Sequence, residues 1–158
     1  MVDHKPPRPI ADERTTLLAL LDYQRESLIA KVRGLDADAA TAVMMQSGTT
    51  LLWLLHHMAQ AETLWMVHRY LGAEPRRDDP GAAPTGTVDD AIAEYRRAAR
   101  RTDAIVTGAD DMDRLCATTG KESPVSLRWV LAHLLEETAR HAGHADILRE
   151  MTDGVTGR

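Results

Sequence analysis

Apolar residues recur every three or four positions in four long stretches of the chain. This spacing places them on one side of a helix with about 3.6 residues per turn. No stretch alternates apolar and polar residues for long enough to indicate a β-sheet, and the chain contains no Phe. The pattern therefore predicts an all-α protein, with helices at about residues 12–33, 50–71, 88–106 and 127–151.

Residues typical of helix ends flank these stretches. Asp12, Thr87 and Ser126 each stand where a side-chain oxygen can accept a hydrogen bond from the first turn of a helix. Gly34 and Gly72 stand where the first and second helices should stop.

Four amphipathic helices of similar length bury their apolar sides most simply as a four-helix bundle. The connections, at about residues 35–49, 72–86 and 107–125, are long for antiparallel hairpins and therefore allow crossovers. We expect a single domain over residues 1–158, in which residues 1–11 form a flexible tail.

Composition narrows the class of protein. The net charge of −5 and the lack of a dense Lys/Arg tract argue against nucleic acid as the main partner. The longest apolar-rich run, 51–67, is broken by polar residues, so no membrane span is expected. The single cysteine, Cys116, cannot form an internal disulfide, and the first residues lack the apolar centre of a signal peptide, which favours the cytoplasm. We expect Cys116 itself to be an inert small residue.

The last predicted helix has an unusual polar side. Glu137, His141 and His144 follow one another at spacings of four and three, on a side that continues to Val130 and Leu148. Polar residues are thus predicted where a core stripe should run.

The second predicted helix carries adjacent histidines, of which helical geometry lets one point firmly inward. The column through His57 contains apolar residues such as Trp53 and Leu64, and also His68, whereas the column through His56 is polar. We therefore expect His57 to face the core. The three tryptophans of the chain are interpreted as core or interface anchors.

The two helices also share a short pattern. Ser or Thr as a cap, Trp three residues later and His seven residues later occur in both, as Trp53 with His57 and as Trp129 with His133. One matched octet suggests similar roles and does not establish a repeat.

Spacing alone leaves the site open. Residues three or four apart on a helix suit two ligands of one ion, so the pairs His133/Glu137, Glu137/His141 and His141/His144 are all candidates. A structural network of hydrogen-bonded side chains is the alternative. Burying a carboxylate among imidazoles without a cation is expensive, which favours a metal or catalytic site.

Three segments carry a family resemblance: ERTTLLALLDYQRESLIAKVRGL, TTLLWLLHHMAQAE and VSLRWVLAHLLEETARHAGHADILREMTDG. With them the chain resembles the DinB/YfiT superfamily, and more closely its mycothiol-dependent branch of S-transferases and maleylpyruvate isomerase. The resemblance extends from about Glu13 to Gly154. It implies a four-helix bundle with crossover topology, often a homodimer, that binds a divalent metal.

The resemblance also implies a ligand set, namely His57, Glu137 and His141. Many members have His-x-x-x-His in the fourth helix, and this chain departs from that pattern with Glu137 at the first position, as the isomerase branch does. His144 and His133 are then expected beside the metal, as catalytic residues that orient ligands or move a proton.

The function expected from this resemblance is transfer of a metal-activated mycothiol thiolate to a small-molecule electrophile. Two imidazoles and one carboxylate suit zinc best, with nickel or another divalent ion as the alternative. A mycothiol-dependent isomerase requires the same thiolate. A non-enzymatic metal or ligand binder, for instance a stress-response protein, and a purely structural bundle are the remaining interpretations.

Overall fold

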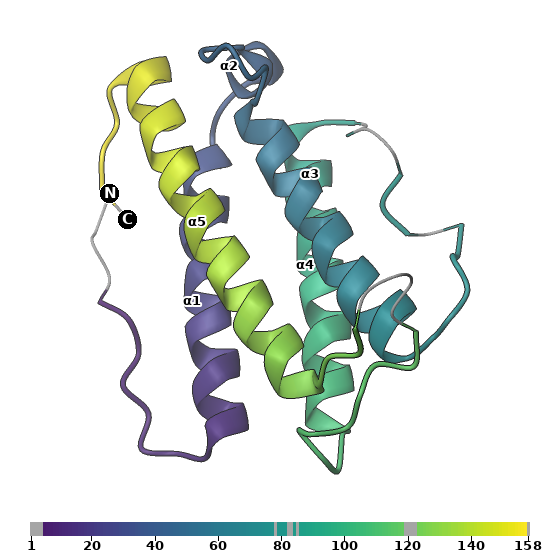
Figure 1. The fold of residues 1–158 in the computed structure, drawn as a ribbon. Coiled ribbons are helices and arrows are strands. Elements are labelled where there is room, and N and C mark those ends of the chain that lie inside the picture. The colour runs from purple at the N-terminus through teal and green to yellow at the C-terminus, as the bar shows by residue number, and fades with distance from the viewer. Residues whose placement is uncertain (1–4, 78, 82–83, 85, 119–122, 158) are drawn as a thin grey trace.

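A computed structural model describes residues 5–77, 79–81, 84, 86–118 and 123–157. These residues fold into helices with no β-strand among them, and Leu115 and Ser126 form an isolated β-bridge. The prediction of an all-α bundle is thereby confirmed. The elements in chain order are α1 (Glu13–Val32), α2 (Ala37–Thr41), α3 (Leu51–Glu62), the π-helix η1 (Thr63–Tyr70), α4 (Val88–Thr107) and α5 (Leu127–Asp153) (Figure 1).

The four long helices begin and end close to where the sequence predicted. The side chains of Asp12, Thr87 and Ser126 accept hydrogen bonds from the backbone three residues on, as N-caps do. Gly34 and Gly72, with φ of 79° and 69°, follow α1 and η1 in the left-handed conformation that glycine adopts without strain. The short helix α2, within the first connection, was not predicted.

Helices α3 and α4 run parallel to each other. His56 of α3 contacts Glu94 of α4, and further along both helices Arg25 of α1 bonds to both Glu62 and Asp103. Parallel neighbours cannot be joined by a hairpin. The connection 71–87 therefore returns along the length of the bundle before α4 begins, which is the crossover that its length allowed (Figure 1).

Helices α1 and α5 form the other parallel pair. Glu13 pairs with Arg128 near the start of both helices, and Lys31 pairs with Asp146 near their ends. In contrast, α3 and α5 are antiparallel and lie side by side across the bundle, which brings the histidines of the two helices to one place (Figure 1).

The second predicted helix does not keep the α-helical period to its end. In η1 the backbone N–H of Leu71 donates to the carbonyl of Met66, five residues earlier, at 3.2 Å. A π-helix holds more residues per turn than an α-helix, so each successive side chain is turned less far around the axis. As a result Trp65, and not Leu64, faces α5 together with His57.

The core consists of two apolar clusters with an ionic layer between them. Arg25 donates to both carboxylate oxygens of Glu62, at 2.8 and 2.7 Å, and to Asp103 at 2.8 Å. The side chains of Arg25 and Glu62 are 2% and 0% exposed. We call Arg25, Glu62 and Asp103 the ionic layer. It ties α1, the end of α3 and α4 together.

No helix in the described part of the chain is both long and apolar enough to cross a membrane.

Candidate metal site and adjoining pocket

Three of the predicted site residues come together between α3 and α5. One nitrogen of His57, one nitrogen of His141 and one oxygen of Glu137 all lie within 4.8 Å of one another. The His57 and His141 rings are 5.0 Å apart and nearly perpendicular, at 82°. His141 Nε2 lies 3.4 Å from Glu137 Oε2, one helical turn earlier on α5. We call His57, Glu137 and His141 the ligand cluster.

The donor set of this cluster suits a divalent cation. Imidazole nitrogen and carboxylate oxygen bind zinc at about 2.0–2.2 Å, which places tetrahedral ligand atoms about 3.4 Å apart. Small side-chain rotations cover the difference from the separations found here. On the other side of His141, Nδ1 lies 3.4 Å from His144 Nδ1. That contact leaves Nε2 as the His141 atom that faces Glu137.

The ligand cluster lies at the margin of the core and not within it, which corrects the prediction from the helix period. Glu137 and His141 are 22% and 13% exposed, and His144 is exposed. The buried stripe of α5 runs one position away from them, through Leu127, Val130, Leu131, Leu134, Thr138, Ala142, Ala145, Leu148 and Arg149. A helix with a wide apolar face has such a border, and there polar side chains stay within reach of solvent and ligand.

The surroundings favour neutral imidazoles in the cluster. Burial lowers the pKa of His57; the Glu137 carboxylate opposes this shift and the neighbouring His56 adds to it. Burial also lowers the pKa of His141, as does the nearby His57, and again Glu137 opposes the shift. A neutral imidazole keeps the nitrogen lone pair that a metal ion needs.

The expectation that His57 and not His56 faces the interior was wrong. His56 is buried, and its ring nitrogens lie 2.9 Å from Glu94 Oε2 and 3.0 Å from the carbonyl of Gly81. The physical reason is that α4 and the crossover connection cover this side of α3 closely, whereas His57 lies on the half-open side toward α5. His56 therefore anchors the crossover connection.

The shared Trp and His pattern of the two helices has a structural counterpart. Trp53 stacks on His57 with ring centroids 4.8 Å apart, and Trp129 stacks on His133 at the same distance. Both tryptophans are partly exposed, at 42% and 44%, so they are not core residues, and the alternative role as interface anchors stays a prediction. In each helix a partly exposed indole instead supports a histidine ring.

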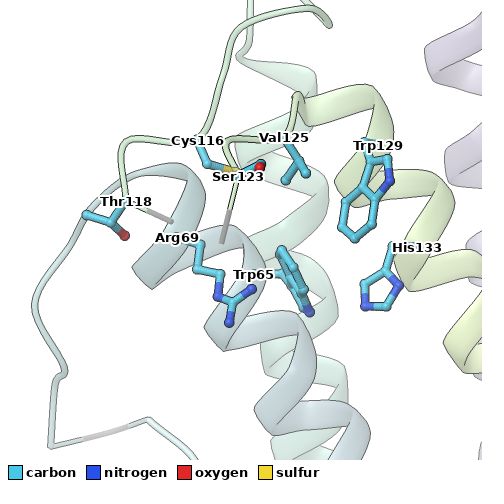
Figure 2. Close-up of a pocket in the computed structure, with 8 residues that line it drawn as sticks. All are labelled: Trp65, Arg69, Cys116, Thr118, Ser123, Val125, Trp129 and His133. Carbon is cyan, nitrogen blue, oxygen red and sulfur yellow. The ribbon is translucent and has the colours of Figure 1, made fainter. Parts of the chain in front are cut away.

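A pocket adjoins the ligand cluster. It has a volume of about 380 Å³ and lies between η1, α5 and the segment that precedes α5 (Figure 2). We call it the ring pocket; its lining residues are Trp65, Arg69, Cys116, Thr118, Ser123, Val125, Trp129 and His133.

His133 joins the pocket to the ligand cluster. Ligand atoms of His133, Glu136 and Glu137 lie within 4.8 Å of one another, so one wall of the pocket is next to a member of the cluster. His133 Nδ1 is 3.8 Å from Glu136 Oε2. Of the two residues expected beside the metal, His144 thus lies on the solvent side of His141 and His133 on the pocket side of Glu137.

Sequence reasoning missed the pocket. Trp65 and Arg69 reach it because the π-helix turns them onto the side of α5, and the apolar pattern gave no sign of a π-helix. The same turn carries His68 away from the side of His57, where an α-helical period placed it, and His68 Nδ1 instead contacts the carbonyl of Ala73 at 2.8 Å. Cys116 is buried in the pocket wall, and burial raises the pKa of its thiol, in keeping with the expected inert role.

Comparison with known families agrees with the resemblance noted in the sequence. The model of a family described as mycothiol-S-transferase matches residues 16–154, from within α1 to the residue after α5. No curated protein matches the chain.

Proposed function

The chain belongs to the mycothiol S-transferase family, and from this premise we propose that it is a metal-dependent enzyme that transfers mycothiol to small electrophiles. The observation that carries the proposal is the convergence of His57, Glu137 and His141 from two helices. The family gives the thiol, and the cluster gives a place where a thiol can be activated.

Three protein ligands leave a coordination position open, as in catalytic and not structural metal sites. A divalent cation in the cluster would supply the positive charge that lowers the pKa of a thiol bound beside it, so that the thiolate is present at neutral pH. Zinc suits two imidazoles and one carboxylate best, and nickel is the second candidate.

The residues of the chain have distinct parts in this reaction. His57, Glu137 and His141 would hold the cation and fix its position, and the contact with His144 would orient His141. His144 is exposed and is therefore placed to take the proton that the thiol loses and to pass it to water. His133 stands between the cluster and the ring pocket, where it contacts and orients the second substrate.

The overall reaction balances without an oxidant or reductant. The sulfur uses its electron pair to form one C–S bond with the electrophile, and the thiol proton is released. In a substitution the leaving group departs with the electrons of its own bond. In an addition to a conjugated double bond, the neighbouring carbon takes up a proton. Both routes give a thioether.

Metal content by elemental mass spectrometry is the experiment that tests the proposal. Untagged protein, purified without chelator, should hold about one divalent ion per chain, as a single three-ligand site requires. His57→Ala and Glu137→Ala should lose the ion. His68→Ala is the matched control, because it removes a histidine of the same helical segment that lies outside the cluster, and it should keep the ion.

The same four proteins should then be assayed with mycothiol and a panel of electrophiles. We expect a rate above the no-enzyme control for wild type and His68→Ala, and none for the two variants without the ion. His144→Ala should keep the ion and lower kcat. A wild-type protein that holds no ion even after incubation with zinc or nickel and dialysis would contradict the proposal, and so would a rate that is independent of the ion.

The homodimer implied by the resemblance and the cytoplasmic location favoured by the cysteine content and the N-terminal sequence stay predictions. Light scattering on the purified protein tests the first, and fractionation of cells that express the chain tests the second.

A further inference from the structure

Trp53 has no ligand atom to offer a metal, yet its indole lies flat against the ring of a residue that has one, His57. We propose that Trp53 is a positioning residue, whose indole holds the His57 ring in the orientation that binds the cation. This inference rests on the proposed function, because it concerns how one ligand of that metal site is oriented.

The first argument is the geometry of the contact. The centroids of the two rings are 4.8 Å apart and the ring planes differ by only 4°. Trp53 and His57 are four residues apart on α3, so the helix itself places the two side chains next to each other. The last side-chain torsion of a histidine is soft, and a flat neighbour restricts it because any rotation of the imidazole gives up the stack.

The second argument is the lack of another contact that would set the plane of the ring. A ligating histidine usually donates its second ring N–H to a carboxylate, a carbonyl or water, and this bond orients the ring. Within the described part of the chain, neither nitrogen of His57 forms a hydrogen bond with a protein group. Its other ring contact is with the edge of His141, at 5.0 Å and 82°. Stacking on Trp53 therefore takes the place of the orienting hydrogen bond.

The other two histidines of the same helical segment show the contrast. The ring nitrogens of His56 lie 2.9 Å from a carboxylate and 3.0 Å from a backbone carbonyl, and His68 Nδ1 lies 2.8 Å from a carbonyl. Neither of these rings contacts an aromatic ring among the described residues. Hydrogen bonds thus orient the two histidines outside the ligand cluster, and an indole orients the one inside it.

The third argument is that a parallel stack is compatible with metal binding. The indole covers a face of the imidazole, whereas a metal binds a ring nitrogen at the edge, in the plane of the ring. One nitrogen of His57 lies within 4.8 Å of the ligand atoms of Glu137 and His141 while the stack is in place. The contact therefore fixes the ring without blocking the donor atom.

The exposure of Trp53 makes the inference testable. Its side chain is 42% exposed, so it buries less apolar area than a core tryptophan and contributes less to the stability of the fold. Replacing it should leave the Tm of the metal-free protein close to that of wild type. A change in metal affinity can then be assigned to the site and not to unfolding.

Zinc affinity, measured by competition with a chromophoric chelator, is the first readout. Trp53→Leu keeps an apolar side chain but removes the flat face, and it should weaken zinc binding about two- to tenfold, the range that an aromatic pair contributes. Trp53→Phe keeps a flat ring and should bind zinc nearly as wild type does. Trp129→Leu is the matched control, because Trp129 is 44% exposed and stacks on His133, which is not in the ligand cluster, so zinc affinity should not change.

Proton NMR of the metal-free protein is the second readout, and it needs neither metal nor thiol. Protons that lie over an indole are shifted upfield by its ring current. The carbon-bound ring protons of His57 should therefore resonate upfield of those of His68, which contacts no aromatic ring in the described chain. The shift should disappear in Trp53→Leu and persist, reduced, in Trp53→Phe.

The two proposals fail in different ways. If wild type binds zinc and Trp53→Leu binds it equally tightly, the inference is overturned and the metal site stands. Equal losses in Trp53→Leu and Trp53→Phe would also overturn it, because the flat face would then not be the cause, and so would an unshifted His57 signal. Absence of zinc binding to wild type would overturn the metal site and this inference together.

Discussion

Two polar groups of side chains link helices of this bundle, the ionic layer within the core and the ligand cluster at its margin, and they differ in how their charges are balanced. In the ionic layer, Arg25 is held by Glu62 and Asp103 with three hydrogen bonds of 2.7–2.8 Å. In the ligand cluster, two imidazoles and a carboxylate face one another, and His141 Nε2 lies 3.4 Å from Glu137 Oε2.

This difference in charge balance distinguishes a structural polar group from one suited to bind a cation. Burial alone would lower the pKa of Arg25, but the carboxylates of Glu62 and Asp103 outweigh it and raise that pKa, so the charge is compensated within the protein. The ligand cluster is half-open to solvent, and its donor atoms converge on one point. The cation near it is Arg140, which lies on the exposed side at 3.8 Å from Glu137. A polar group that is closed on itself holds helices together, whereas one with converging lone pairs is suited to a cation.

The largest effect should come from breaking the ionic layer. Glu62→Ala leaves the Arg25 guanidinium buried without its main partner, and we expect the free energy of unfolding to fall by about 3–5 kcal/mol. Urea denaturation followed by circular dichroism measures this loss.

The double variant Arg25→Met/Glu62→Leu is the control for that prediction, because it removes both charges and fills the space with apolar side chains. The double variant should lose much less free energy of unfolding than Glu62→Ala alone. If the free energy of unfolding of Glu62→Ala lies within about 1 kcal/mol of the wild-type value, Glu62 is not the partner that compensates the buried charge of Arg25.

At the ligand cluster, the thermal stability of the protein should depend on bound metal and not on the contacts among the three side chains. A ligand that binds only the folded state stabilises it by about 2.7 kcal/mol when its free concentration is a hundred times Kd. Added zinc should therefore raise the Tm of wild type, and a chelator should reverse the rise. Glu137→Gln, which keeps the shape of the side chain, should show no response to either.

Without metal, Glu137→Gln and wild type should have nearly equal Tm, because Glu137 is partly exposed and its contact with His141 is long. A large difference between the two metal-free proteins would indicate a structural polar network in place of a metal site.

The fold could be predicted from the sequence because its signals are local. The helical periods, the caps at Asp12, Thr87 and Ser126 and the glycine stops lie within a few residues of the ends that they define. The length of the connection 71–87 was enough to allow the crossover. Contacts between distant residues could not be predicted in this way. Arg25 and Glu62 are 37 residues apart, and neither local sequence pattern indicates that the two side chains pair.

The site was predicted in part. Helical spacing placed Glu137 and His141 on one side of α5, but it left three ligand pairs open, and the choice of His57, Glu137 and His141 came from the family resemblance. The π-helix and the ring pocket were not predicted, because an α-helical period was extended through Thr63–Tyr70. The error placed Leu64 and His68 where Trp65 and Arg69 lie.

The smallest effect on stability should come from replacing Asp79, a charged residue that belongs neither to the ionic layer nor to the ligand cluster. Asp79, in the crossover connection, accepts a hydrogen bond from Arg101 at 2.8 Å and another from the backbone N–H of Arg76 at 2.6 Å. Burial acts to raise the pKa of Asp79, but these bonds outweigh it and hold the pKa below the usual 3.8. We expect Asp79→Asn to cost about 1 kcal/mol at neutral pH.

The pH dependence of that cost follows from the direction of the shift. Because the folded-state pKa of Asp79 is lowered, its contribution is fully present above the ordinary value of 3.8 and is lost as the pH falls through the lowered folded-state value. The stability difference between wild type and Asp79→Asn should thus be present at about pH 5 and shrink below about pH 4. Asp110→Asn, at an exposed position, should show no such trend in parallel urea titrations. A difference that grows as the pH falls would mean that the carboxylate of Asp79 opposes folding, and the connection would then be held by His56 and its neighbours instead.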